Sequence, residues 1–364
     1  MRSFIISMLR SAYMQLPVLA LVFSLSCVQP FDIGIDVNGT QQLVVEGSVN
    51  DADEVVTVRL RTSGSFEGVS VNTLGVNAQV QIVSGADEIT HLNEISPGLY
   101  RTDTAALLGQ VGESYTLRIQ LANGESYTST METIPQPVNI SQGRAEALET
   151  RGVSDDRIPF VEYSHNVYAK LENTSENHFV RVTAAGWARV QVDYPLCGGF
   201  DGGSTGPPGP QICWSRRNPI TSQVNTVTNQ AVTGSEYEVL ADNVPFDFRD
   251  AYVADLFANA MSPEAFAYWE LAKLQIERAG GLFDPPFAPV VGNIRNVNDP
   301  DEVVLGYFHA YARTSTRVCF DRAGTPAFVN IPILDCLTTC TQFFRPAVFE
   351  LPFDLEDSCP DLER

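Results

Sequence analysis

Hydrophobic and polar residues alternate with a period of two over several short stretches in the N-terminal part of the chain. This period is typical of strands with one buried face. Asn123-Gly124 separates two such stretches and predicts a β-hairpin. We expect an immunoglobulin-like β-sandwich over residues 43–134, because short strands recur there between turn residues. Its predicted strands are residues 43–49, 55–60, 78–83, 115–121 and 126–131.

The remainder, residues 135–364, begins with a Pro-Gln-Pro stretch that suits an interdomain linker. Its pattern is also β-rich, with predicted strands at residues 179–183 and 188–192. Residues 252–260 fit either a strand, in which alternate side chains are buried, or a helix. We therefore predict a mostly β protein, whose second β-rich domain carries one or two inserted helices.

The clearest helical pattern lies near residues 263–279. Ser262 suits the N-cap, Pro263 the first helical position and Gly280 the C-terminal cap. Apolar residues fall on two faces of this helix, so we expect it to be sandwiched between other elements. On this pattern Trp269 is predicted to be a core residue rather than part of a ligand-binding surface.

The N-terminus has the layout of a secretory signal peptide. Two arginines and no acid precede an apolar run at residues 16–25, and Ser26 is a small residue before Cys27. The run is shorter than the roughly 20 apolar residues that span a bilayer. We expect a signal peptide at residues 1–26, a lipid on Cys27 and a tether over residues 27–42. Because the usual lipobox has leucine three positions before the cysteine and this chain has serine, a plain thiol at Cys27 is the alternative.

The chain has seven cysteines, and lipidation of Cys27 leaves an even number of others. In an exported protein an even number favours disulfides, although sequence alone does not determine the pairing. Cys197 with Cys213 is the pair that we expect first, since these residues bracket one Gly/Pro-rich segment. The alternative of a zinc site in the Cys336-to-Cys340 segment lacks a second ligand pair nearby. The disulfide candidates are Cys197, Cys213, Cys319, Cys336, Cys340 and Cys359.

The segment at residues 197–213 is too rich in glycine and proline to bury much surface, and we expect a loop insertion. Its closure by a disulfide would stabilise the fold by on the order of 3 kcal/mol. One interpretation is a recognition loop that displays Phe200 and Trp214. The other is a surface insertion without a binding role, and both stay open.

The chain is strongly acidic, with a net charge of −21, and loss of the two arginines in residues 1–26 makes it −23. Such a surface repels phosphate backbones, so we expect no nucleic-acid partner. No nucleophile elbow, phosphate-binding loop or histidine pair with metal-ligand spacing occurs in the sequence. We therefore expect no catalytic residue, no metal and no cofactor.

Five short motifs follow one another along the chain in a definite order. They are Leu-Val-Val-Glu-Gly at residues 43–47, Ser-Pro-Glu-Ala at 262–265, Phe-Asp-Pro at 283–285, Gly-Asn-Ile at 292–294 and Leu-Gly-Tyr-Phe at 305–308. In this combination the chain resembles the Bacteroidota lipoprotein family classed as domain of unknown function 4249. The resemblance implies an outer-membrane lipoprotein, often encoded beside a TonB-dependent receptor, without established enzymatic activity. Within the motifs, Gly292 and Gly306 suit turns or close packing.

The leading hypothesis is therefore a cell-envelope lipoprotein that acts as an accessory binding or assembly partner of a TonB-dependent outer-membrane receptor. The alternative is an adhesion or scaffold module that binds extracellular polymer. A hydrolase with paired carboxylates ranks last, because the separation of two carboxylates cannot be read from sequence. The lipid would hold the protein in the outer membrane, at either the cell surface or the periplasmic face, since only Asp32 supplies an acid close to Cys27.

Overall fold

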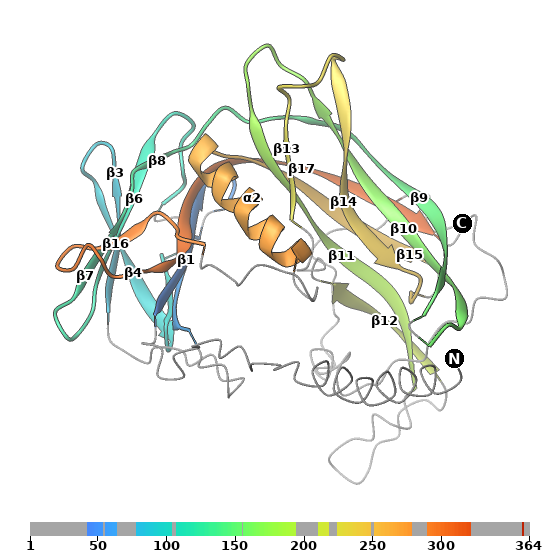
Figure 1. Ribbon diagram of the computed structural model, residues 1–364, viewed down its shortest axis with the longest axis horizontal. Coiled ribbons are helices and arrows are strands. Elements are labelled where there is room, and N and C mark those ends of the chain that lie inside the picture. Colours follow the sequence, from blue (N-terminus) through green and yellow to red (C-terminus); the bar gives the residue numbers. More distant parts are fainter. Residues whose placement is uncertain are drawn as a thin grey trace, which may run out of the picture. The chain divides into compact units, whose positions relative to one another are not determined.

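Long, mostly antiparallel strands make up the greater part of the computed structural model (Figure 1). The structure describes residues 42–53, 55–63, 78–103, 107–154, 156–193, 210–217, 224–248, 251–278, 290–321 and 359. These residues all belong to one compact unit. The predicted mostly β class is confirmed, and the described part contains a single α-helix.

The first group of strands alternates buried and exposed side chains, as the period-two pattern predicts. Val45, Val58 and Leu60 are almost completely buried on neighbouring strands of this group. Its strands pair in the order β1-β2-β5-β4-β3-β6-β7-β16, with β8 beside β6. The predicted hairpin at Asn123-Gly124 is confirmed by the pairing of β6 with β7 and by a φ of +91° at Gly124. The bounds are β1 (Leu43–Asn50), β2 (Thr57–Thr62), β3 (Gln79–Ser84), β4 (Ile89–Ser96), β5 (Leu99–Arg101), β6 (Ser114–Gln120), β7 (Ser126–Ser129), β8 (Glu132–Thr133) and β16 (Ile294–Asn296).

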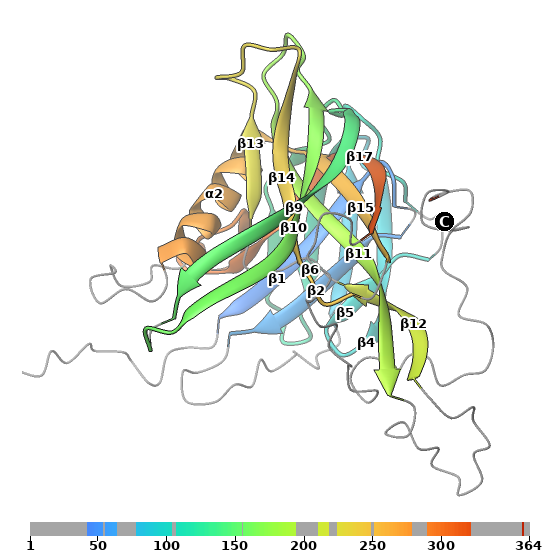
Figure 2. The ribbon, with the colours of Figure 1, turned by 90° about the vertical axis from the view of Figure 1, so that its right-hand side faces the viewer.

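Most strands of the second group are longer. β9 (Ile140–Val153), β10 (Pro159–Glu172) and β14 (Glu236–Pro245) form a three-stranded sheet and lie side by side in both views (Figure 1, Figure 2). The two predicted strands at residues 179–183 and 188–192 are parts of one strand, β11. The remaining members are β11 (Phe179–Asp193), β12 (Pro210–Arg217), β13 (Asn225–Thr228), β15 (Ala251–Ala260) and β17 (Leu305–Asp321).

Strand β17 joins the two groups. Its first part, from Leu305 to Tyr311, pairs in parallel with β1, and its second part, from Ala312 to Asp321, pairs antiparallel with β15. A parallel pair needs a long connection between its strands, and here nearly the whole chain supplies it. Hydrogen bonding therefore runs without a break from the N-terminal strands to the C-terminal ones.

Residues 252–260, which fitted a strand or a helix, lie in the strand β15, with Tyr252, Ala254 and Leu256 buried. Helix α2 (Pro263–Arg278) agrees with the predicted helix. The expectation that α2 is sandwiched between other elements is wrong. Ala265 is fully buried, but Leu271 is 54% exposed, so one face of the helix contacts the sheet and the opposite face meets solvent.

Cys319, in β17, forms a disulfide with Cys359, and their Cα atoms are 5.7 Å apart. Cys213 lies in β12, which begins at Pro210, inside the segment expected to be a loop. Several predictions concern residues outside the described part of the chain. They are the signal peptide at 1–26, Cys27 and most of the tether, and Cys197, Phe200, Cys336 and Cys340.

Candidate functional site

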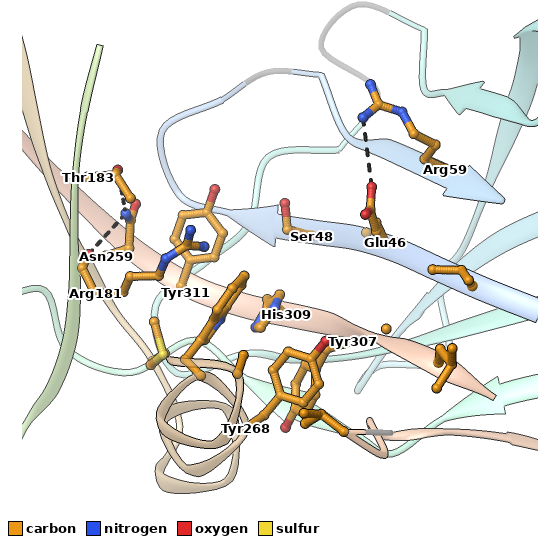
Figure 3. A pocket seen from close by; sticks show the side chains of 18 of the residues that line it. Glu46, Ser48, Arg59, Arg181, Thr183, Asn259, Tyr268, Tyr307, His309 and Tyr311 are labelled. Carbon is orange, nitrogen blue, oxygen red and sulfur yellow. Dashed lines mark hydrogen bonds and ion pairs between the residues drawn. The ribbon is translucent and has the colours of Figure 1, made fainter. Parts of the chain in front are cut away.

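A cavity of about 710 Å³ lies where β1, β11 and β17 meet helix α2 (Figure 3). Its described lining combines aromatic rings, aliphatic side chains and three arginines. Rings from α2 and β17 stand close together along one wall, and Arg181 reaches toward them from β11, which is separated from β17 by β15. The cavity is large enough for a small organic molecule, because ligand pockets usually measure about 300–1,000 Å³.

The regular periods of strand and helix bring these side chains to one place. Tyr307, His309 and Tyr311 are alternate residues of β17 and therefore point to the same face of the sheet. Tyr268 and Trp269 lie on the side of α2 that packs against this face, where Ala265 anchors the helix. The wall is thus built on two rigid elements rather than on loops.

The rings of the wall form a continuous stack. The centroids of Tyr268 and Tyr307 are 4.8 Å apart, and those of Tyr307 and His309 are 4.6 Å apart. The ring of Trp269 stacks on His309 at 5.5 Å, with an interplanar angle of 16°. The guanidinium carbon of Arg181 lies 3.6 Å from the centroid of Trp269, at cation–π distance. Trp269, predicted to be a core residue, is half-buried: it packs against the core cluster that includes Ala265 and Tyr307, and it also lines the cavity.

The three arginines of the lining differ in their partners. Arg59 faces Glu46 at 3.8 Å, and Arg313 binds Asp53 at 2.8 Å. Arg181 has no ion pair or side-chain hydrogen bond with any described residue, and its Nε is buried without a hydrogen-bond partner there. Burial lowers the pKa of Arg181 to about 10, so the side chain remains a cation at neutral pH.

Two further buried donor or acceptor atoms beside Arg181 have no hydrogen-bond partner in the described part of the chain. They are Nε1 of Trp269 and Nδ1 of His309. Burial lowers the pKa of His309 to about 3, so its ring is neutral at physiological pH. Because buried polar atoms are nearly always paired, these atoms are left to pair with water or with a ligand.

A buried carboxylate holds one ring of the cavity wall in place through hydrogen bonds. Glu132 of β8 accepts hydrogen bonds from the hydroxyls of Tyr307 and Ser262, both at 2.7 Å, and from Nδ2 of Asn293 at 3.3 Å. The Ser262 hydroxyl also accepts the backbone N–H of Ala265 and so caps α2. Burial raises the pKa of the Glu132 carboxyl above its ordinary value. Glu132 therefore connects the first turn of α2 to a ring of the cavity wall.

The two glycines singled out in the sequence lie at close backbone contacts, as predicted. A Cβ atom on Gly292 would stand 1.5 Å from the carbonyl oxygen of Gly306. Gly306 has a φ of +92°, and a Cβ atom there would stand 2.0 Å from the carbonyl oxygen of Val45. Only glycine allows β17 to approach β1 in this conformation. The motif residues thus have structural roles at the edge of the cavity.

A second hollow, of about 900 Å³, is lined by residues 130–133, 135–138, 174–179 and 260–264. Its histidine is satisfied, because Nε2 of His178 contacts the Tyr237 hydroxyl at 2.6 Å and Nδ1 contacts the Thr174 hydroxyl at 3.3 Å. Its most buried carboxylate, Glu132, has the three donors described above. The buried polar groups of this hollow therefore already have hydrogen-bond partners, unlike those of the cavity beside Arg181 that have none within the described chain.

The sequence missed this site. Of the two predicted binding residues, Phe200 lies outside the described part, and Trp214 lies in β12, opposite Arg189 of β11 and outside the described lining of the cavity. The signal was present in the alternation of Tyr307, His309 and Tyr311. The sequence does not show that Arg181, which is far from these residues in the chain, lines the same cavity.

Within the described residues, no group of three or more histidine, cysteine, aspartate or glutamate side chains is arranged to hold a metal ion. No described helix is both long and apolar enough to cross a membrane.

Comparison with protein-family models matches residues 28–317 to the family described as "Domain of unknown function (DUF4249)". A search of curated proteins finds no match.

Proposed function

Since the chain belongs to the DUF4249 family, we propose that it is a ligand-binding lipoprotein of the cell envelope and works beside a TonB-dependent receptor. Its cavity would hold a small organic molecule, and its lipid would keep it at the outer membrane. Binding, rather than catalysis, is the activity that this site suits best. The sequence supports the anchor through the apolar run at residues 16–25 and the small Ser26 before Cys27.

One observation carries the ligand-binding part of the proposal. A cavity of about 710 Å³ is walled by stacked rings and holds buried polar atoms without partners in the described chain. Apolar walls with a few polar groups are the usual composition of small-molecule sites. A rigid wall, held by Glu132 and the cap of α2, also reduces the entropy that binding would cost.

The uncharged dye N-phenylnaphthylamine tests the cavity, with calorimetry as the measurement. We expect it to bind the chain from residue 28 onward, and Ala272→Phe to weaken binding at least tenfold, because Ala272 lines the cavity. Leu271→Phe is the matched control, since Leu271 lies next to it on the exposed face of α2. If neither this dye nor its anionic counterpart, anilinonaphthalene sulfonate, binds, or if both substitutions act alike, the cavity is not a ligand site.

The anchor and the partner are tested in cells that produce the full chain. We expect a radiolabelled fatty acid to be incorporated into the protein and Cys27→Ser to abolish the label. Detergent extraction of the outer membrane should then co-purify the protein with a TonB-dependent receptor. If the protein carries the lipid but always elutes alone, the lipid anchor is supported and the association with a receptor is contradicted.

A further inference from the structure

Arg181 is the one arginine of the described cavity lining that has no carboxylate partner. Desolvating a cation without a counter-charge is unfavourable. Contact with the face of Trp269 offsets part of this cost. A ring face, however, leaves the in-plane N–H groups of the guanidinium without acceptors.

The groups around Arg181 do not neutralise it. His309 is uncharged, and burial raises the pKa values of Tyr268 and Tyr311, so both phenols keep their protons. The described lining holds three arginines but one carboxylate, Glu46, in a chain whose net charge is −21. Figure 3 shows Glu46 turned toward Arg59, away from Arg181. The cavity is therefore a locally positive site in an acidic protein.

The backbone around Arg181 is held firmly. Nδ2 of Asn259 donates to the carbonyl oxygen of Arg181 at 3.2 Å and contacts the Thr183 hydroxyl at 3.3 Å. Oδ1 of Asn259 accepts from Nε of Arg313 at 2.9 Å. These contacts fix the strand that carries the charge, and preorganised charges bind with a smaller entropic cost.

We propose that the ligand of this cavity is a small amphiphilic organic anion, whose anionic group pairs with Arg181 and whose apolar body lies against Val44, Tyr268, Ile276 and Leu305. This inference rests on the proposed ligand-binding function and specifies the class of ligand. A planar guanidinium suits a carboxylate, sulfonate or phosphate group, because each presents two oxygens to parallel N–H donors. The aliphatic side chains named here line the same cavity as Arg181.

The test compares two dyes that differ by one charged group. Anilinonaphthalene sulfonate is an anion, and N-phenylnaphthylamine is its uncharged counterpart. We expect the wild-type chain to bind the sulfonate at least tenfold more tightly, and Arg181→Gln to remove that preference while N-phenylnaphthylamine binds within twofold of the wild type. Arg144→Gln makes the same change in net charge on the exposed surface of β9, and it should alter neither affinity.

The outcomes separate this inference from the proposed function. If N-phenylnaphthylamine binds and the sulfonate is not preferred, or if Arg181→Gln leaves the preference intact, the anionic ligand class is wrong and the cavity remains a ligand site. If neither dye binds the wild type, the proposed function fails as well. Thermal melting without dye is measured for every variant, and a large loss of stability in Arg181→Gln would assign Arg181 a structural role and overturn the inference.

Discussion

Gly306 shows how one residue decides whether two distant strands can pair. Its φ of +92° belongs to a region that other residues avoid, and the carbonyl oxygen of Val45 occupies the space of a side chain. Gly124 has nearly the same φ, +91°, in the β6–β7 hairpin, but no atom lies within 4 Å of the added Cβ position. Substitutions at the two glycines therefore distinguish the cost of backbone strain from the cost of steric contact.

We predict that Gly306→Ala lowers the free energy of unfolding by about 3 kcal/mol, from strain and from overpacking against β1. Gly124→Ala should cost about 1 kcal/mol, from strain alone. Urea unfolding followed by tryptophan fluorescence measures both. Equal losses for the two variants would mean that the close approach to Val45 does not matter.

Glu132 is a buried carboxyl whose pKa is raised by desolvation above its ordinary value of 4.5. A group with a raised pKa binds more protons in the folded state than in the unfolded state, so its contribution to stability falls as pH rises from the unfolded value through the folded one. Replacement by glutamine removes this titration.

We therefore predict that the stability of the wild type relative to Glu132→Gln decreases as pH rises from about 4.5 toward 7. Because both proteins retain the other carboxyl groups, the contributions of those groups to the free energy of unfolding cancel in the comparison. Urea unfolding at several pH values gives the difference. A difference that is flat or rises over this range contradicts the assignment of a raised pKa to Glu132.

At the scale of elements, helix α2 depends on its first turn. The Ser262 hydroxyl caps the helix through Ala265 and donates to Glu132, so one oxygen atom serves both the helix and the cavity wall. The sequence predicted this helix and its N-cap correctly, because capping signals are local. It did not predict which of the two apolar faces packs, since that depends on the sheet that the helix meets.

We predict that Ser262→Ala lowers the free energy of unfolding by about 2 kcal/mol, through the lost cap and the lost donor to a buried carboxylate. Ser262→Thr keeps a hydroxyl and should lose far less. Hydrogen exchange of the amides in the first turn of α2 reports on the cap directly. If Ser262→Ala and Ser262→Thr lower the free energy of unfolding equally, the hydroxyl neither caps the helix nor stabilises Glu132.

On the scale of the whole molecule, β17 unites parts of the chain that are far apart in sequence. It pairs with β1 and β15, and its end is joined through Cys319 to Cys359, 40 positions away. A covalent loop of this length removes many conformations from the unfolded chain. The disulfide should therefore matter more for stability than any single side-chain contact of the strand.

We predict that Cys319→Ser and Cys359→Ser each lower the free energy of unfolding by on the order of 4 kcal/mol, and that the double variant loses no more than either one. The measurement is urea unfolding without reductant. Treatment of the wild type with reductant should reproduce the loss. Additive losses in the double variant would show that the cysteines act separately.

By itself, the sequence determined local structure. Period-two alternation, Asn123-Gly124 and Ser262-Pro263 identified strands, a hairpin and a helix, because each depends on neighbours within a few positions. The mostly β class followed from their number. Strands β9, β10 and β14 were not predicted; β9 in particular has no fully buried residue and no clear alternation.

Only the tertiary structure decided what surrounds the cavity. Asn50 donates to the hydroxyl of Tyr311 across 261 positions of sequence, and Arg181 meets Trp269 only because helix α2 packs against β11. The cost of a buried charge depends on which groups lie within a few ångströms of it. A sequence lists those groups without their distances. The fold brings Arg181 to a wall of neutral rings, and that placement makes it a site for an anion.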